Sequence, residues 1–225
     1  MILPILKEYV CLVHGWVDPS VTEIQKRIRV DKKKGFVRST VSDSGKSAYT
    51  ELATLAHLSR APDGMSKGDA SEERYSLVAL KLHTGRTHQI RVHMLAIGHP
   101  LVCDRKYAES RFPADRTWCR RNFLHTFHLS LQDVPEGSDL GSASCLQELV
   151  KVYCPLPEDL RGALAELDPM DETSGAQRDA WLSGDTARLC SFEQYAGRAL
   201  ALAAAEVDAK TGAEANSYRG DRWWG

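Results

Sequence analysis

The residues best suited to do chemistry lie together in one segment, residues 84–100. Arg86 and Arg91 stand there with His88 and Gln89 between them. Guanidinium groups and the free backbone N–H groups of a helix N-terminus both bind anions. The pattern therefore indicates a site for a phosphate or a carboxylate, and a helix that merely carries surface arginines is the plain alternative.

A helix must position these side chains. Apolar residues recur at helical spacing through the segment, and Gly98 followed by Pro100 is typical of a helix C-terminus. Thr87 has the right chemistry for an N-cap. The spacing thus predicts a helix from about residue 88 to residue 97.

Strands dominate the rest of the first 160 residues. Short runs rich in β-branched and aromatic residues alternate with glycine, proline and polar residues, a pattern typical of sheet strands. A polar loop over residues 60–73 suggests a hairpin between two of these runs. We expect strands at residues 9–13, 36–41, 48–55, 75–82, 122–131 and 149–153.

Charge is divided unevenly along the chain. Residues 1–128 contain 21 Lys and Arg against 13 Asp and Glu, whereas residues 129–225 contain 8 against 17. The first part thus carries +8 and the second −9, although the whole chain carries only −1. The basic part can attract a polyanion such as RNA, but a solvated surface would look the same in composition.

Composition limits the class of protein. With 225 residues and 43% hydrophobic residues, the chain can build a core, which excludes wholesale disorder. Its apolar runs are shorter than the roughly 18 residues of a membrane-spanning helix, and no secretory signal is evident. Six cysteines without a C-x-x-C pair favour a reduced, intracellular compartment.

A metal site is not expected. His88 and His93 are five residues apart and would point to different sides of a helix, unlike the i, i+4 pairs of metal-binding helices. His125 and His128 lack a cysteine pair at zinc-finger spacing. We expect His88 and His93 to orient the loop by hydrogen bonds, and His99 to cap the following turn.

At these residues the sequence resembles the RluA-type family of pseudouridine synthases, which convert uridine in RNA from an N- to a C-glycoside. Residues 83–94 read HTGRTHQIRVHM, followed by Gly98-His99-Pro100 and by Asp104. Further segments occur in the family's order: KEY at 7–9, LVHG at 12–15, GKSAYT at 45–50, LH at 124–125 and PLPED at 155–159. The resemblance covers residues 7 to 164. One departure is Cys103, where the family usually has a glycine.

The resemblance implies an α+β fold, a mixed and mainly antiparallel sheet with flanking helices, that accepts a uridine flipped out of structured RNA. It implies that Tyr9 stacks on the target uracil and that Arg91 pairs with the catalytic aspartate. It implies no metal and no organic cofactor, and a protein that acts as a monomer. RNA contacts are expected from Arg86, Thr87, His88, Gln89 and Arg105.

The family's catalytic aspartate belongs to an H-R-L-D-x-x-T-S-G segment that precedes the K-x-Y segment, and these 225 residues do not contain it. Asp31 lies in a similar R-V-D-K string, but it follows Tyr9 and lacks the T-S-G. We expect the chain by itself to be inactive, either as part of a working synthase or as a noncatalytic RNA-binding relative. Asp31 and Asp104 are the acids to examine as substitutes.

Two regions are expected in the chain. Residues 1–167 form the partial catalytic domain, and residues 168–225 form an acidic, Ala-rich C-terminal tail. We expect the tail to pack loosely after about Asp171, with an Ala-rich helix at residues 199–209 and a frayed end at 216–225.

Overall fold

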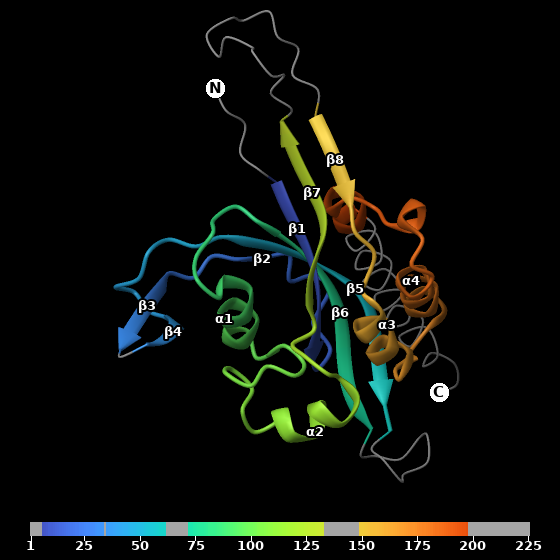
Figure 1. Cartoon of the computed structure of the whole chain (residues 1–225), viewed down its shortest axis with the longest axis horizontal. Helices are drawn as coiled ribbons and strands as arrows, with labels where there is room; N and C mark the ends of the chain where they lie inside the picture. The colour runs from blue at the N-terminus through green and yellow to red at the C-terminus, as the bar shows by residue number, and fades with distance from the viewer. Residues whose placement is uncertain (1–5, 34, 62–71, 133–148, 198–225) are drawn as a thin grey trace, which may run out of the picture.

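One antiparallel sheet organises the computed structural model, which describes residues 6–33, 35–61, 72–132 and 149–197 (Figure 1). A separate antiparallel hairpin stands beside it, formed by β3 (Ile28–Lys33) and β4 (Phe36–Val41). In spatial order the strands of the sheet are β2 (Glu23–Ile24), β5 (Thr50–Arg60), β6 (Glu73–Leu82), β1 (Leu6–His14), β7 (Leu124–Gln132) and β8 (Leu149–Tyr153), with β9 (Asp168–Pro169) also paired to β5.

Helices flank this sheet. The helices are α1 (Gln89–Ala96), α2 (Phe112–Trp118), α3 (Glu158–Ala165) and α4 (Glu172–Leu182), followed by a 3-10 turn (Thr186–Arg188). The expected α+β class, with a mainly antiparallel sheet and flanking helices, is confirmed.

Strand β1 lies at the centre of the sheet because β6 and β7 pair with its two edges. Successive side chains of a strand point to opposite faces. Val10 and Leu12 accordingly enter one apolar cluster, while Cys11 and Val13 enter another, and all four are fully buried. The sheet is therefore covered on both faces.

Different helices cover the two faces. Ile90 and Met94 of α1 pack on the face of Cys11 and Val13. On the face of Val10 and Leu12, α3 and α4 contribute their apolar residues, among them Leu160 and Trp181. Helix α1 and its chemistry thus belong to one face, and the face beneath α3 and α4 is sealed by core packing.

The sequence locates most strands but not their ends. Strands β4 and β8 have the predicted bounds, whereas β1 begins at Leu6 and β6 at Glu73, both earlier than predicted. Strand β5 begins at Thr50 and continues to Arg60, well beyond the predicted end. These extensions lie where polar residues continue the pairing between neighbouring strands.

The prediction that the chain packs loosely after Asp171 is wrong for residues 172–195. Trp181 is only 1% exposed, and its ring meets the ring of Phe127 edge-on, 5.1 Å between centroids. Tyr195 is 2% exposed and belongs to the same cluster. Apolar residues set among acidic and small ones complete the core here, so the composition of the tail was a poor guide to its packing.

A polar contact also ties this segment to the central strand. Glu8 of β1 is fully buried, and the backbone N–H of Phe192 donates to its Oε2 at 2.9 Å. Nδ1 of His128 lies 2.9 Å from the same oxygen. The boundary between residues 167 and 168 stays a prediction, and the expected structure at 199–209 and 216–225 lies outside the described residues.

Replacing Trp181 tests the importance of this packing. Trp181→Ala should lower the free energy of unfolding by about 3–5 kcal/mol, because it removes a large buried ring and leaves a cavity. Chemical denaturation followed by circular dichroism measures the change. Arg188→Ala, at an exposed position on the 3-10 turn, is the control and should change stability by less than about 0.5 kcal/mol. Equal stability of the two variants would show that residues 172–195 pack loosely after all.

Candidate functional site

The loop before α1 is held by Gln89. The side-chain amide of Gln89 donates to the carbonyl oxygen of Tyr49 at 2.9 Å and to Oγ1 of Thr50 at 3.0 Å. Its Oε1 accepts from the hydroxyl of Thr84 at 2.8 Å and from the backbone N–H of Arg86 at 3.0 Å. Gln89 is 2% exposed, so its amide has no free group for RNA and holds the loop instead.

These contacts also set the start of the helix. The predicted N-cap, Thr87, is wrong: the N-cap is His88, in the left-handed conformation at φ 57°, and no side chain caps the helix. Arg86 receives the N–H of Gln89 on its carbonyl oxygen at 3.0 Å. The reciprocal pair between Arg86 and Gln89 thus takes the place of a hydroxyl cap.

The end of α1 agrees with the prediction. Gly98 has a φ of 88°, which suits glycine because it has no Cβ. The N–H of Gly98 donates to Leu95 at 3.0 Å, and the N–H of His99 donates to Met94 at 2.9 Å. This is the Schellman pattern, in which both bonds satisfy carbonyl groups left free at a helix end.

Arg91 is paired with Asp104. Nε and Nη2 of Arg91 donate to the two carboxylate oxygens at 2.7 Å and 2.5 Å. The side chain of Asp104 has no exposed surface, whereas that of Arg91 keeps 20% exposed. Oδ1 of Asp104 also accepts from the backbone N–H groups of Lys106 at 3.0 Å and Tyr107 at 3.1 Å. A buried and fully bonded carboxylate therefore holds a partly exposed guanidinium in place.

Tyr107 supports the same guanidinium from another side. Its ring centre lies 4.8 Å from Cζ of Arg91, within the range of a cation–π contact. Its hydroxyl accepts the backbone N–H of Ser39 at 2.9 Å and lies 2.9 Å from Nδ1 of His88. Tyr107 thus connects α1 to strand β4.

His88 is held neutral in this network. Burial lowers the pKa of His88 below its ordinary value of 6.5, and the charges of Arg91 and Lys106 lower it further. A neutral His88 can accept the hydroxyl proton of Tyr107 on Nδ1, which leaves the Tyr107 oxygen free to receive Ser39. We assign this tautomer from the hydrogen bonds.

His93 makes structural hydrogen bonds, as expected, whereas His99 bonds back to β1 instead of capping the following turn. Nδ1 of His93 lies 2.9 Å from Oγ1 of Thr50, and its Nε2 lies 2.9 Å from the carbonyl oxygen of Lys26. Burial lowers the pKa of His93, so its ring too is neutral. His99 donates from Nδ1 to the carbonyl oxygen of His14 at 2.9 Å. Within the described ranges, no group of three His, Cys, Asp or Glu side chains could hold a metal ion.

Cys103 occupies a backbone conformation that suits glycine. Its φ is 57°, which accounts for the usual glycine at this position of the family pattern. The N–H of Cys103 donates to Oδ2 of the buried Asp115 at 2.7 Å, and Nε2 of His14 lies 3.0 Å from the same oxygen. This anchor fixes the backbone immediately before Asp104.

Tyr9 lies on the same face of the sheet as α1. It is partly buried and packs against the cluster that contains Cys11 of β1 and Ile90 and Met94 of α1. Being on the central strand, it stands between β6 and β7. The stacking of its ring on the target uracil stays a prediction.

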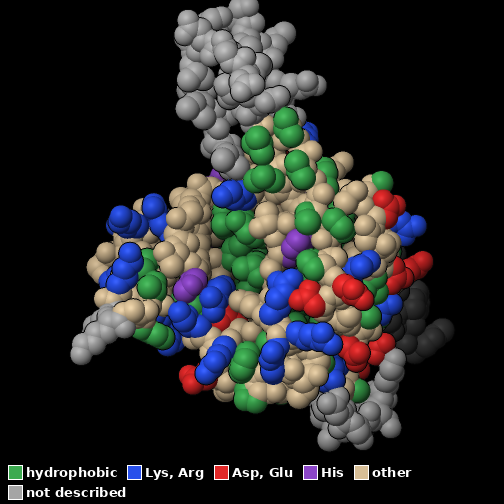
Figure 2. Space-filling view, in the orientation of Figure 1, with side chains coloured by type: hydrophobic (Ala, Val, Ile, Leu, Met, Phe, Trp, Pro, Cys, Tyr) green, Lys and Arg blue, Asp and Glu red, His purple; other side chains and the backbone are tan. Residues whose placement is uncertain are grey.

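The other expected RNA contacts have different surroundings. Nε of Arg86 donates to the carbonyl oxygen of Ser47 at 3.0 Å, and the carbonyl oxygen of Thr87 accepts the hydroxyl of Ser39 at 2.6 Å. The side chains of Thr87 and Arg105 are exposed. Figure 2 shows Lys and Arg side chains over the β3–β4 hairpin and across the lower centre of the view, with Asp and Glu gathered at the right.

Neither acid named as a substitute nucleophile is suited to that role. Asp31 is on the β3–β4 hairpin and pairs with Arg29 at 3.2 Å, with both side chains about half exposed. Asp104 has both oxygens engaged by four donors and no surface for a ribose to approach. The resemblance implied that Arg91 pairs with the family's catalytic aspartate, whereas in the structure the carboxylate partner of Arg91 is Asp104.

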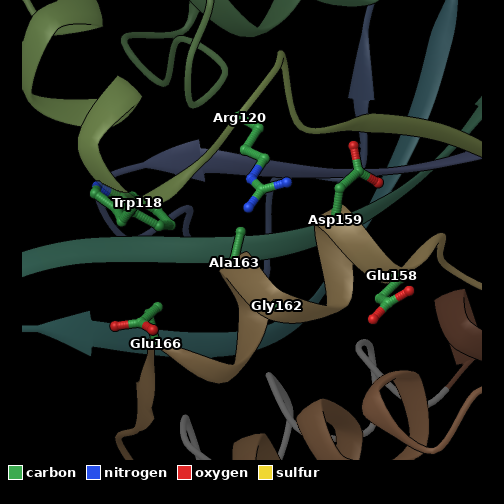
Figure 3. Close-up of a pocket in the computed structure, with 7 residues that line it drawn as sticks. All are labelled: Trp118, Arg120, Glu158, Asp159, Gly162, Ala163 and Glu166. Carbon is green, nitrogen blue, oxygen red and sulfur yellow. The ribbon is translucent and has the colours of Figure 1, made fainter.

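A pocket elsewhere on the molecule has the wrong charge to bind RNA. A pocket of ≈ 680 Å³ lies between the end of α2 and helix α3. Figure 3 shows Trp118 and Arg120 facing α3, which carries Glu158 and Asp159 and is followed by Glu166. Three carboxylates against one guanidinium would repel a polyanion.

Comparison with known proteins agrees with the sequence motifs and the fold. Residues 4–96 match the family model described as RNA pseudouridylate synthase. The chain is 34% identical over 133 residues to RNA pseudouridylate synthase domain-containing protein 1 of Mus musculus, covering 56% of this chain and 40% of that protein. It is 29% identical over 183 residues to tRNA pseudouridine synthase C of Salmonella typhi, covering 78% of this chain and 67% of that one.

A solved structure supports the same relation. The structure of human RNA Pseudouridylate Synthase Domain Containing 1 superposes with a TM-score of 0.54 at 30% identity, over 77% of this chain and 66% of that chain. The chain spans about 40% of the length of the mouse and human relatives. Motifs, sheet and relatives agree: the chain is similar to RNA pseudouridine synthases in sequence and in fold over the part that they share.

Proposed function

We propose that this protein binds structured RNA on the α1 face and takes part in the isomerisation of uridine to pseudouridine. The observation that carries the proposal is the guanidinium of Arg91, which Asp104 and Tyr107 fix in place while part of it stays exposed. A fixed, partly exposed guanidinium suits the binding of a phosphate or a nucleotide displaced from its helix.

Each residue has a distinct part in this proposal. Arg91 positions the flipped nucleotide, and the ring of Tyr9 stacks on its uracil. Arg86 and Arg105 contribute positive charge near the entry to the site, and the exposed Thr87 and the loop before α1 border it. His88 acts through Tyr107, because its ring is bonded to that hydroxyl.

The chemical step needs a carboxylate that these residues do not supply. In the isomerisation the N1–C1′ glycosidic bond breaks, a C5–C1′ bond forms, the C5 proton is lost and N1 gains one. Positioning alone leaves the glycosidic bond intact. Both carboxylate oxygens of Asp104 are hydrogen-bonded to Arg91, so Asp104 does not supply this group. A noncatalytic RNA-binding role for the chain by itself is therefore the second candidate.

The proposal also covers the oligomeric state, the compartment and the RNA substrates. We infer that the protein works as a monomer inside the cell, with transfer and ribosomal RNA as the substrates to test first. Five cysteines of the described residues are unpaired, which suits a reducing compartment. No helix in the described part of the chain is long and apolar enough to cross a membrane.

The 225-residue chain should bind structured RNA without converting it. Fluorescence anisotropy with a labelled stem-loop measures binding, and tritium release from C5-labelled uridine measures conversion. Adding a polypeptide that carries an H-R-L-D segment should restore conversion, because it supplies the missing carboxylate. Conversion by the chain alone would contradict the prediction, and the absence of binding at low salt would overturn the proposed function.

Removing the acid behind Arg91 should weaken RNA binding. Asp104→Asn should raise the Kd for RNA about tenfold, because Arg91 loses the anion that fixes it. Added to Arg91→Ala, the same substitution should have little further effect, because no guanidinium is left to position. Anisotropy titrations of the single and double variants measure both effects.

Asp159→Asn is the matched control for this cycle. Asp159 pairs with Arg121 at 2.6 Å, and both side chains are partly exposed. Its loss should change the Kd by less than about twofold. Additive effects of Asp104→Asn and Arg91→Ala would show that Asp104 does not act through Arg91.

A further inference from the structure

A second hollow lies beside the loop that leads into α1. It has a volume of ≈ 480 Å³, and we call it the hairpin pocket. Its walls come from strand β3, from the loop that follows β4, and from the turn before α1. The lining residues that the argument uses are Arg29, Lys32, Gly45, Lys46, Arg86 and Thr87.

All the charged side chains that line this pocket are positive. Arg29, Lys32, Lys46 and Arg86 line it, and none of the lining residues is acidic. The exposed Asp31 pairs with Arg29 but is not among the lining residues. Four cations around a hollow attract an anion with several charges more strongly than isolated surface lysines do.

The walls of the pocket are fixed by backbone contacts. Ile28 and Lys46 exchange two backbone hydrogen bonds, each 2.9 Å long. Gly45 packs so closely on β3 that a Cβ would lie 2.6 Å from the backbone nitrogen of Arg29. Nε of Arg86 donates to the carbonyl oxygen of Ser47 at 3.0 Å. The hollow is therefore formed before any ligand arrives, which lowers the entropic cost of binding.

The hairpin pocket is joined to the site around Arg91. Thr87 lines the pocket, and its carbonyl oxygen accepts the hydroxyl of Ser39 from β4. The N–H of Ser39 donates to the hydroxyl of Tyr107, whose ring supports Arg91. A strand of RNA held at Arg91 can thus continue across one connected, cationic surface.

We propose that the hairpin pocket binds the sugar–phosphate backbone of the RNA strand next to the nucleotide held at Arg91. The ligand class is a phosphodiester chain, because several separated cations and no acidic side chain line the pocket. These contacts position the strand without reading its sequence. The proposal rests on the proposed function, since it takes the RNA at Arg91 as given.

Charge reversal in the pocket tests the proposal. The side chains of Lys32 and Lys46 are exposed and make no hydrogen bond with another described residue, so Lys32→Glu/Lys46→Glu should fold normally. Equal unfolding midpoints check the fold. The slope of log K for RNA against log salt concentration should become shallower by about 2, and binding should weaken at least tenfold at low salt.

A matched control separates this pocket from general charge. Arg120→Glu/Arg188→Glu makes the same change of charge at exposed positions outside the pocket. It should leave the salt slope unchanged and the Kd within about threefold, since neither residue lines the hairpin pocket. Equal effects of the two double variants would overturn the proposal.

The remaining outcomes distinguish the two proposals. If the unmodified chain binds RNA and Arg91→Ala weakens that binding, but Lys32→Glu/Lys46→Glu does not, only the hairpin pocket proposal fails. If the unmodified chain binds no RNA, the proposed function fails as well. Inorganic phosphate, tested at the ionic strength of a chloride control, should not displace the RNA. Displacement specific to phosphate would make the pocket a site for free anions and overturn the proposal.

Discussion

The contact between Arg91 and Asp104 is the interaction on which the rest of the site depends. It joins the first turn of α1 to the loop after that helix, and it places a guanidinium where a ligand can reach it. Breaking a buried pair costs several kcal/mol, because the remaining charge has lost both water and partner. The loop around Asp104 is in turn fixed by Asp115, which receives the N–H of Cys103.

Strand β1 lets one protein domain keep two very different faces. Its alternate side chains serve an apolar core under α3 and α4 and a second core under α1. The first face is closed by the segment that carries Trp181 and Phe192, and the N–H of Phe192 donates to Oε2 of the buried Glu8. With that face sealed, polar and cationic groups are free to occupy the other.

Local signals in the sequence were enough to predict much of this architecture. Runs such as residues 36–41 and 149–153 matched their strands because Gly35 and Ser42 flank the first run and Cys154-Pro155 follows the second. The motif around Arg91 placed the helix, and Gly98 marked its end. Helices α3 and α4 were missed, since their apolar residues are sparse and their stability comes from packing on the sheet. The hydrogen bond between Gln89 and Tyr49 joins residues far apart in the sequence, so no local pattern predicts it. Gln89 was therefore predicted to contact RNA.

The position of β1 also shapes how the chain folds. Its two neighbours in the sheet, β6 and β7, are formed by residues 73–82 and 124–132, far later in the sequence. Such distant pairing slows folding, because long loops must close before the strands gain their hydrogen bonds. At ribosomal speeds the strand waits roughly 5 to 20 s for β7 to be made. During that interval the edge of β1 that pairs with β7 is open, and this apolar strand is available to chaperones and to pairing with other nascent chains.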